Sequence, residues 1–339
     1  MTVRIGFLGA GLIAGFHARS LAASGADFAF AGVHDVDPER AEKLASWTGL
    51  TVCPSADAVV DSCDAVYVCT WTSEHPGLVD LAVRAGRAVF CEKPLAVDLH
   101  GTAAMAATVA AAGVTNQVGL VMRTSNSFAW LRHLIDDPDS RRLMSITFHD
   151  DQILPVRGWY GSTWRSDPAK AGSGVLLEHS IHDVDMVELL GGRVESVSAN
   201  AAHMHGIEHI EDLVAATFRY ANGAMANLTT VWHDIPERLN DRRVEVLCER
   251  LWAVLEGDSI GPVRWQRPGE SPQSLQGEAL LARVAELGLT PANADGSFVA
   301  AVAAGAPASP DFADALRAHV VVDAAYRSAA AGGTAVALS

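Results

Sequence analysis

The stretch Val3–Phe16, which reads VRIGFLGAGLIAGF, decides the fold of the N-terminal half. Its first six residues, Val3–Leu8, form a short apolar run typical of a strand buried on both faces of a parallel sheet. The next six, Gly9–Ala14, match the pattern GxGxxA and open a helix. Glycines here allow a tight bend and the close approach of a pyrophosphate, which the N–H groups at Leu12 and Ile13 can bind. The stretch predicts a dinucleotide-binding unit, and a tight turn without a ligand is the alternative.

The same alternation of strand and helix continues to residue 121. The predicted strands are Val3–Leu8, Phe28–His34, Ala65–Cys69, Ala88–Cys91 and Asn116–Val121. The predicted helices are Leu12–Ser24, Pro38–Thr48, His75–Ala85 and Asp98–Ala112. Short apolar strands separated by helices are typical of α/β proteins. We therefore expect residues 1–121 to form a Rossmann domain with a doubly wound parallel sheet.

Residues 122–339 show a different pattern and predict a second domain of the α+β class. The predicted helices are Phe128–Ile135, Val175–Leu190 and Asp311–Ala330. The predicted strands are Leu143–Gln152, Val194–Ala202, Asp212–Tyr220, Ala224–Val231 and Arg243–Cys248. Asn222-Gly223 is a strong hairpin signal, and we expect loops at Gly158–Gly174 and Arg267–Gln276. The long alternating segments predict a large, mostly antiparallel sheet.

The composition excludes several classes of protein. Of 339 residues 49% are hydrophobic, which is enough for a sizeable core, but no uncharged run is long enough to span a membrane. Forty acidic against 25 basic residues give a net charge of −15, which argues against a nucleic-acid partner. The five cysteines form no CxxC pair, and the first residues read as a strand rather than a signal peptide. We expect a cytoplasmic protein with reduced thiols.

Asp35 follows the second predicted strand, 21 residues beyond Ala14. A carboxylate at this place accepts both ribose hydroxyls of an adenosine and repels a 2′-phosphate, so it favours NAD over NADP. A turn or capping role is the alternative, but Asp37 stands in the better capping position before Pro38.

Lys93 lies in Cys91-Glu92-Lys93-Pro94, directly after a predicted strand. Ligands of open parallel sheets bind at the carboxyl ends of the strands, which places this lysine beside the expected cofactor. A lysine whose pKa is lowered by burial or by a nearby cation can act as a general acid or base. The alternative is a solvated lysine on a loop.

The segment Glu178–Asp185, EHSIHDVD, gathers acid/base residues on one predicted helix. Glu178 and His182 are four positions apart and would share a face, and Asp185 could orient His182. Such a set serves either proton transfer or metal binding, and the residues alone leave both readings open.

Taken together, these motifs resemble the Gfo/Idh/MocA oxidoreductase family over nearly the whole chain. The matching segments are Gly9–Ala14, Val66–Cys69 with Thr70–His75, Cys91–Pro94, Gln117–Arg123, Trp164-Arg165, Gly172–Gly174, Glu178–Asp185 and Asp314–Ser328. The resemblance implies NAD(P)-dependent hydride transfer to or from a CH–OH or C=O carbon of a sugar, cyclitol or related polyol. It implies no metal, and NAD rather than NADP agrees with Asp35.

The resemblance also implies residue roles. Lys93 and His182 would be acid/base groups, with Glu178 beside them where many members carry Asp. The expected cofactor contacts are Gly9, Gly11, Leu12, Ile13, Asp35, Thr70, Trp71, His75, Glu92 and Lys93. The expected substrate contacts are Arg123, Trp164, Arg165 and Glu178.

Two other functions stay open at this point. One is a non-catalytic regulator that senses the cofactor on the same fold. The other is a metal-dependent hydrolase or isomerase that uses Glu178, His182 and Asp185 as ligands. Because open faces of antiparallel sheets often pair, we also expect a homodimer or homotetramer.

Overall fold

The computed structural model describes residues 1–157, 160–238, 240–289 and 293–338, and the chain divides into two units. Unit 1 comprises Met1–Leu120 and Ala292–Leu316, and unit 2 comprises Val121–Pro291 and Arg317–Ser339. The predicted second domain, 122–339, therefore included a segment that belongs to unit 1. This segment is short, lies far from residues 1–121 in sequence, and joins them only through tertiary packing.

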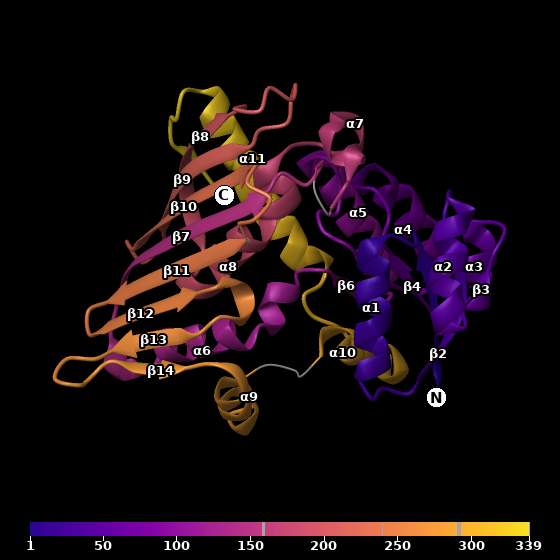
Figure 1. The fold of residues 1–339 in the computed structure, drawn as a ribbon, viewed down its shortest axis with the longest axis horizontal. Helices are drawn as coiled ribbons and strands as arrows, with labels where there is room; N and C mark the ends of the chain where they lie inside the picture. Colours follow the sequence, from indigo (N-terminus) through magenta and orange to yellow (C-terminus); the bar gives the residue numbers. More distant parts are fainter. Residues whose placement is uncertain (158–159, 239, 290–292, 339) are drawn as a thin grey trace. The chain divides into compact units, whose positions relative to one another are not determined.

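Unit 1 contains a six-stranded parallel sheet in the order β3-β2-β1-β4-β5-β6, which is the Rossmann order (Figure 1). Its strands are β1 (Val3–Leu8), β2 (Phe28–His34), β3 (Thr51–Val52), β4 (Ala65–Val68), β5 (Ala88–Cys91) and β6 (Asn116–Val118). The doubly wound parallel sheet is confirmed. The sequence analysis missed β3, whose two residues are too few to show a pattern.

Helices cover both faces of this sheet. They are α1 (Leu12–Ala23), α2 (Pro38–Thr48), α3 (Ala56–Ser62), α4 (His75–Arg84), α5 (Leu99–Ala112) and α10 (Ala294–Ala304). One core joins α3, α4 and α5 to the sheet, and the other joins α1, α2 and α10 to it. Phe298 and Val299 of α10 are fully buried in the second core, which explains why this late segment belongs to unit 1.

Unit 2 is built on a nine-stranded sheet in the order β14-β13-β12-β11-β7-β10-β9-β8-β15. Its strands are β7 (Leu143–Ile153), β8 (Val194–Ala202), β9 (Leu213–Tyr220), β10 (Met225–His233), β11 (Asp241–Cys248), β12 (Leu251–Glu256), β13 (Val263–Gln266), β14 (Gln273–Leu275) and β15 (Val336–Ala337). β7 and β10 run parallel and the other neighbours run antiparallel, as expected of the α+β domain. The Asn222-Gly223 hairpin joins β9 to β10, with Gly223 at φ 85°.

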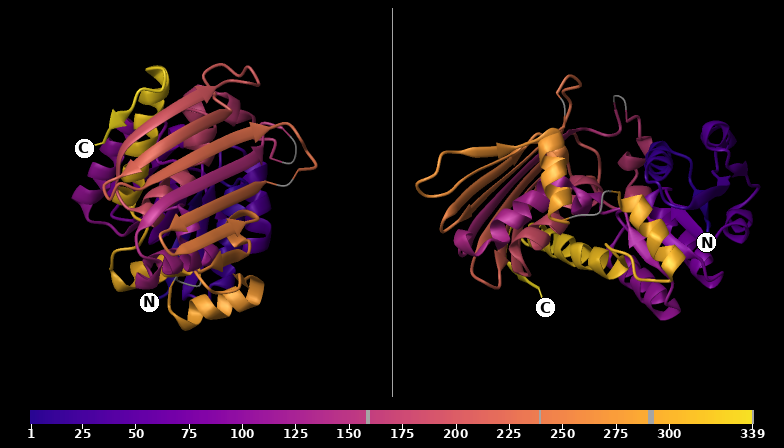
Figure 2. Two further views of the ribbon diagram at one scale, coloured as in Figure 1. Left: turned by 90° about the vertical axis from the view of Figure 1, so that its left-hand side faces the viewer. Right: turned by 90° about the horizontal axis from the view of Figure 1, so that it is seen from below.

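The helices of unit 2 lie on one face of the large sheet, and Figure 2 shows its other face turned toward the viewer. They are α6 (Asn126–Asp136), α7 (Pro168–Ala171), α8 (Ile181–Gly191), α9 (Gly277–Glu286) and α11 (Phe312–Ala330), which belongs to unit 2 from Arg317 onward. The short helical turns of unit 2 are η2 (Val121–Thr124), η3 (Pro138–Ser140), η4 (Thr163–Ser166), η5 (Val175–His179) and η6 (Asp258–Ile260). Among the described residues, no helix has the length and apolar character that crossing a membrane requires.

Two expected elements of unit 2 differ from the structure. The helix predicted over Val175–Leu190 is broken at Ser180 into the π-helical turn η5 and the α-helix α8. The loop expected at Arg267–Gln276 contains strand β14, which pairs with β13. The loop expected at Gly158–Gly174 begins with two residues that lie outside the described residues, and its described part contains η4 and α7.

Candidate active site

The loop between β1 and α1 has the geometry of a phosphate-binding turn. Gly9 has φ 90°, and a Cβ there would lie 2.5 Å from the carbonyl oxygen of Cys69. Around Gly11, by contrast, a Cβ would meet no described atom within 4 Å. Gly9 is therefore required by the fold itself, whereas Gly11 leaves open space for a ligand to approach the backbone.

The start of α1 faces this open space with unsatisfied donors. Gly11 is the N-cap residue and supplies no side-chain cap. Leu12 and Ile13 follow it and are 55% and 37% exposed. An uncapped helix N-terminus beside exposed apolar side chains fits the phosphates and sugars of a dinucleotide.

Asp35 lies at the end of β2 and is held against this loop. Its Oδ2 accepts the N–H of Ala10 at 2.6 Å, and its Oδ1 accepts the N–H of Asp37 at 2.8 Å. Asp37 caps α2, as expected, by accepting the N–H of Glu39. Although Asp37 takes the capping role, Asp35 is itself fixed by these two backbone donors. A carboxylate offers about four acceptor positions, so two remain for ribose hydroxyls.

Lys93 follows β5 and is half-buried, whereas its neighbour Glu92 is buried. One oxygen of Glu92 lies 2.8 Å from His17 Nε2, and the other accepts the N–H of Lys93 at 3.2 Å. A Cβ on Gly119 would come within 2.3 Å of the Glu92 carboxylate, so this glycine makes room for it. The Glu92 carboxylate therefore fixes the Lys93 turn, and its expected contact with the cofactor stays a prediction.

His17 joins Glu92 to a third buried residue, Asp295 of α10, at 2.8 Å. Burial alone lowers the pKa of His17, but the hydrogen bonds and charges of Asp295 and Glu92 outweigh it and raise this pKa to about 10. The imidazole is therefore a buried cation between two carboxylates. The sequence analysis missed this cluster, although His17 lies on the otherwise apolar buried face of α1 with Ala14, Ala18 and Leu21.

His75 connects two loops at the same edge of the sheet. Its ring nitrogens lie 2.9 Å from the carbonyl oxygen of Pro94 and 3.3 Å from that of Thr70. The side chain is 1% exposed, and burial lowers its pKa. His75 therefore holds the Thr70 and Lys93 loops together and presents no accessible polar atom to a cofactor. Thr70 and Trp71, expected as cofactor contacts, are half-buried beside it.

In unit 2, three expected substrate-site residues come together. Arg165 Nε lies 3.0 Å from Glu178 Oε2, and the Arg165 guanidinium carbon lies 4.6 Å from the centre of the Trp164 ring. Glu178 is 4% exposed, whereas Trp164 and Arg165 are half-buried. The carboxylate is thus fixed by a cation that itself stacks on an aromatic ring.

Arg123 and Asp185 form a second fixed pair. Nε and Nη2 of Arg123 donate to the two oxygens of Asp185 at 2.8 and 2.6 Å. This bidentate contact ties η2 to α8, with Asp185 almost fully buried. Asp185 thus anchors its own helix to Arg123, and its expected orientation of His182 stays a prediction.

His182 is 8% exposed and lies in the first turn of α8. The helix expected to carry both Glu178 and His182 is interrupted between them, because η5 has π-helical geometry and the Ser180 N–H donates to the Val175 carbonyl oxygen. That the two side chains share one face stays a prediction. Single π-helical turns occur frequently at functional sites.

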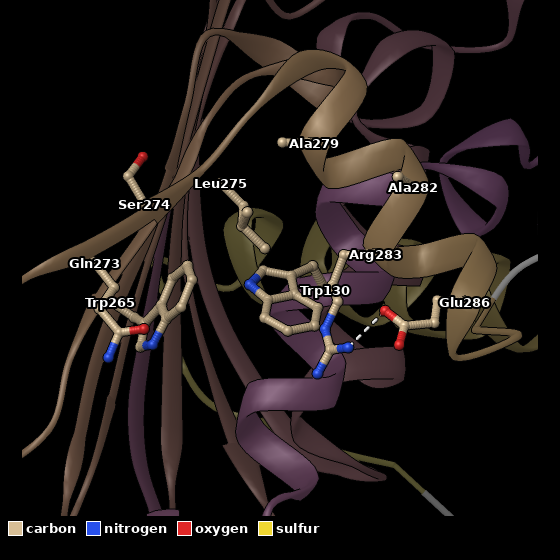
Figure 3. Close-up of a pocket in the computed structure, with 9 residues that line it drawn as sticks. All are labelled: Trp130, Trp265, Gln273, Ser274, Leu275, Ala279, Ala282, Arg283 and Glu286. Carbon is tan, nitrogen blue, oxygen red and sulfur yellow. Dashed lines mark hydrogen bonds and ion pairs between the residues drawn. The ribbon is translucent and has the colours of Figure 1, made fainter.

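The remaining possibilities for a site are weaker. Within the residues that the structure describes, no group of three or more His, Cys, Asp or Glu side chains could hold a metal ion. A pocket of about 510 Å³ lies beside Trp130, Trp265 and α9 (Figure 3). None of the expected site residues lines it, and the ion pair drawn there joins Arg283 and Glu286 of one helix. This pocket is separate from the candidate active site.

Comparisons with known proteins agree with this geometry. Residues 3–120 match the family described as "Oxidoreductase family, NAD-binding Rossmann fold", and residues 128–254 match the "GFO/IDH/MocA C-terminal domain". The N-terminal unit is thus an NAD-binding Rossmann fold.

The similarity to some known proteins covers nearly the whole chain. The inositol 2-dehydrogenase of Rhizobium meliloti (strain 1021) is 31% identical, covering 97% of this chain and 98% of that protein. The myo-inositol dehydrogenase Hyg17 of Streptomyces leeuwenhoekii is 33% identical over 99% and 100% of the two chains. Among solved structures, levoglucosan dehydrogenase in complex with NADH shares the fold at a TM-score of 0.87, with 20% identity and full coverage of both chains.

Proposed function

The chain belongs to the Gfo/Idh/MocA oxidoreductase family, and from this premise we propose that it transfers a hydride between NAD and the CH–OH or C=O carbon of a sugar, cyclitol or related polyol. The observation that carries the proposal is the edge of the unit 1 sheet. There the open space at Gly11, the fixed carboxylate of Asp35 and the Lys93 turn all follow the carboxyl ends of parallel strands.

The chain's own residues supply binding and proton transfer. Bound NAD would supply the hydride chemistry, held by the N–H groups at the start of α1 and by Asp35. Lys93 Nζ gives a proton to the reacting oxygen during reduction and takes one during oxidation. His182 serves as the second acid/base group, and Glu178, fixed by Arg165, accepts hydrogen bonds from substrate hydroxyls.

The test is a dehydrogenase screen with inositols, aldoses and their keto forms, using NAD, NADP and their reduced forms. Turnover of at least one of these substrates, followed by nicotinamide absorbance, supports the proposal. If NADH binds but wild type and Lys93→Met are equally inert with the whole panel, the cofactor-sensing alternative replaces it.

Chelation separates the enzyme from the remaining alternative, a metal-dependent hydrolase or isomerase. Glu178 and Asp185 are both paired with arginines, which disfavours their use as ligands. We expect full activity after treatment with EDTA and no stoichiometric metal in elemental analysis of the purified protein. Activity that falls on chelation and returns with a divalent cation would favour the metal site.

Cofactor preference depends on Asp35. We expect Asp35→Ser to reduce the ratio of kcat/KM for NAD to that for NADP by about tenfold or more, because the charge that repels a 2′-phosphate is lost. Asp37→Ser is the matched control, since serine also caps a helix and the ribose contact is untouched. An unchanged ratio in Asp35→Ser would remove Asp35 from cofactor selection.

We also propose that two copies pair through the uncovered face of the nine-stranded sheet. Met144, Met225 and Leu247 lie on strands of this sheet with about half of each side chain exposed, as in a surface that a partner covers. Light scattering should show a dimer or a tetramer of the 35.7 kDa chain.

The five free thiols favour a reducing, cytoplasmic location.

A further inference from the structure

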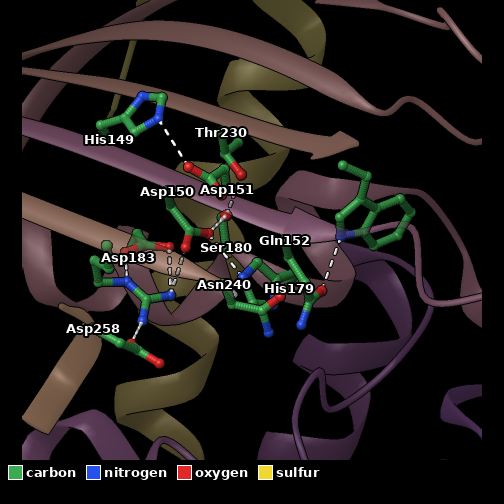
Figure 4. A network of polar contacts seen from close by, with 12 residues as sticks. His149, Asp150, Asp151, Gln152, His179, Ser180, Asp183, Thr230, Asn240 and Asp258 are labelled. Carbon is green, nitrogen blue, oxygen red and sulfur yellow. Dashed lines mark hydrogen bonds and ion pairs between the residues drawn. The ribbon is translucent and has the colours of Figure 1, made fainter. Parts of the chain in front are cut away.

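Ser180 stands at the N-cap of α8, but its hydroxyl does not cap the helix. Ser180 Oγ donates to Asp150 Oδ2 at 2.9 Å, and therefore Thr230 Oγ1, 2.6 Å away, donates to Ser180. A serine at this position usually accepts an N–H from the first turn. The chain instead uses the hydroxyl to tie the break between η5 and α8 to strands β7 and β10 (Figure 4).

Asp150 of β7 holds the other side of the same break. The carboxylate is 2% exposed, and its Oδ2 also lies 2.8 Å from His179 Nε2, the last residue of η5. One buried carboxylate thus binds the residue before the break and the residue at it. Because regular helical hydrogen bonds are interrupted here, side-chain contacts fix the course of the backbone.

Arg242 of β11 belongs to the same cluster and contacts three carboxylates. Its Nε lies 2.6 Å from Asp183 Oδ1, its Nη2 lies 3.1 Å from Asp150, and its Nη1 contacts Asp258. Arg242 is 2% exposed, and Asp183 is fully buried. A single cation therefore joins β7, β11, η6 and the first turn of α8.

His182 lies between the anchored positions Ser180 and Asp183, and Glu178 lies immediately before His179. The backbone that carries both site residues is thus fixed by charges buried beneath it. Burial raises the pKa of Asp183 to about 6 even though Arg242 lowers it, so this carboxylate depends strongly on its arginine. For Asp150, burial is outweighed by the charges of His179 and Arg242, and its pKa is lowered.

We propose that Arg242 is a positioning residue for the hydride-transfer reaction: through Asp183 and Asp150 it fixes the segment that presents Glu178 and His182 to the substrate. The inference rests on the proposed function for the roles of those two residues. Arg242 itself is buried and acts only through its carboxylate partners.

The test compares Arg242→Met and Arg242→Lys with Arg243→Met. Arg243 is the next residue of β11, is half exposed, and pairs with Glu245 and Glu256 away from this cluster. We expect Arg242→Met to lower kcat by about 30- to 100-fold, while the Kd for NADH changes by less than about twofold, since misplaced groups slow chemistry more than cofactor binding. Arg242→Lys should recover part of kcat, because an ammonium restores the charge but not the forked contact.

A folded Arg242→Met variant with the kcat of Arg243→Met would overturn the inference, and so would an equal loss of kcat and NADH affinity. If Arg242→Met shows no cooperative unfolding transition, it is not folded, and Ser180→Ala then tests the inference in its place. This variant removes one hydroxyl and leaves every buried charge paired. A decrease of about fivefold or more in kcat at unchanged NADH affinity supports the inference, and wild-type kcat refutes it.

His182→Gln in the same assay separates this inference from the proposed function. If His182→Gln is inactive and the Arg242 variants behave as the control, only the positioning role fails. If His182→Gln retains full activity, the proposed proton-transfer role of His182 fails, whatever the Arg242 variants show.

Discussion

Lys93→Met is expected to lower kcat by about 10²- to 10⁴-fold, the range that a positioned general acid or base contributes. Methionine matches the length and apolar stem of lysine but carries no proton. The turn that holds Lys93 is fixed by backbone contacts to Glu92 and by His75 against Pro94, so the loop should keep its shape. Steady-state kinetics with the best substrate of the screen measures the effect.

Two controls accompany this variant: the kinetics of Lys43→Met and the binding of NADH by Lys93→Met itself. Lys43→Met, at an exposed position of α2 in the same unit, should leave both kcat and NADH affinity at wild-type values. We expect Lys93→Met to bind NADH with an affinity within about threefold of wild type, since only the proton-transfer step is lost. A Lys93→Met enzyme with near-normal kcat would show that another group moves the proton.

The second large effect is expected at His17, on stability rather than on chemistry. His17→Leu leaves Glu92 and Asp295 buried without their common cation, and breaking a buried pair in this way costs about 3–5 kcal/mol. Denaturant unfolding followed by circular dichroism measures the loss. Arg19→Leu, on the exposed side of the same helix, is the matched control and should lie within about 0.5 kcal/mol of wild type.

The pH dependence of stability follows from the same group. The pKa of His17 is raised from 6.5 to about 10 in the folded chain, so its stabilising contribution is complete below pH 6.5 and is lost as the pH rises through about 10. Wild type should therefore lose stability between pH 7 and 10 more steeply than His17→Leu. Parallel pH profiles of the two proteins would show that His17 is neutral in the folded state.

The local sequence was sufficient for the elements of unit 1 that form a Rossmann sheet. Val3–Leu8, Phe28–His34 and Ala88–Cys91 are strands with the predicted bounds, because each is a mostly apolar run. The same reasoning missed β3 and α3, which are too short to show a period, and the strands β12 to β15, of which β14 and β15 form the edges of the large sheet. It also misjudged Val175–Leu190, which was predicted as one helix but is interrupted at Ser180 by the π-helical turn η5.

Some residues of the candidate site could likewise be predicted from the sequence, and others could not. Motif spacing was enough to single out Gly9, Gly11, Asp35, Lys93, Glu178 and His182. The partners that fix these residues were not found, because His17, Asp295, Asp150 and Arg242 come from distant segments. Two of them did carry a signal: His17 on the buried face of α1, and Arg242 on the buried side of β11 beside Val244 and Val246. A charged residue within a buried apolar set predicts a paired internal charge.

The sequence by itself determined the parallel sheet, the phosphate-binding loop and the family, since these depend on local periodicity and on residues adjacent in the chain. Only the tertiary structure decided which unit holds Ala292–Leu316, which carboxylates pair with which arginines, and where the helix before His182 breaks. The physical reason is that buried charges must be neutralised by whichever partner the fold brings within reach. A charged residue in a buried apolar set can be recognised, but the identity of its distant partner cannot be read from sequence spacing.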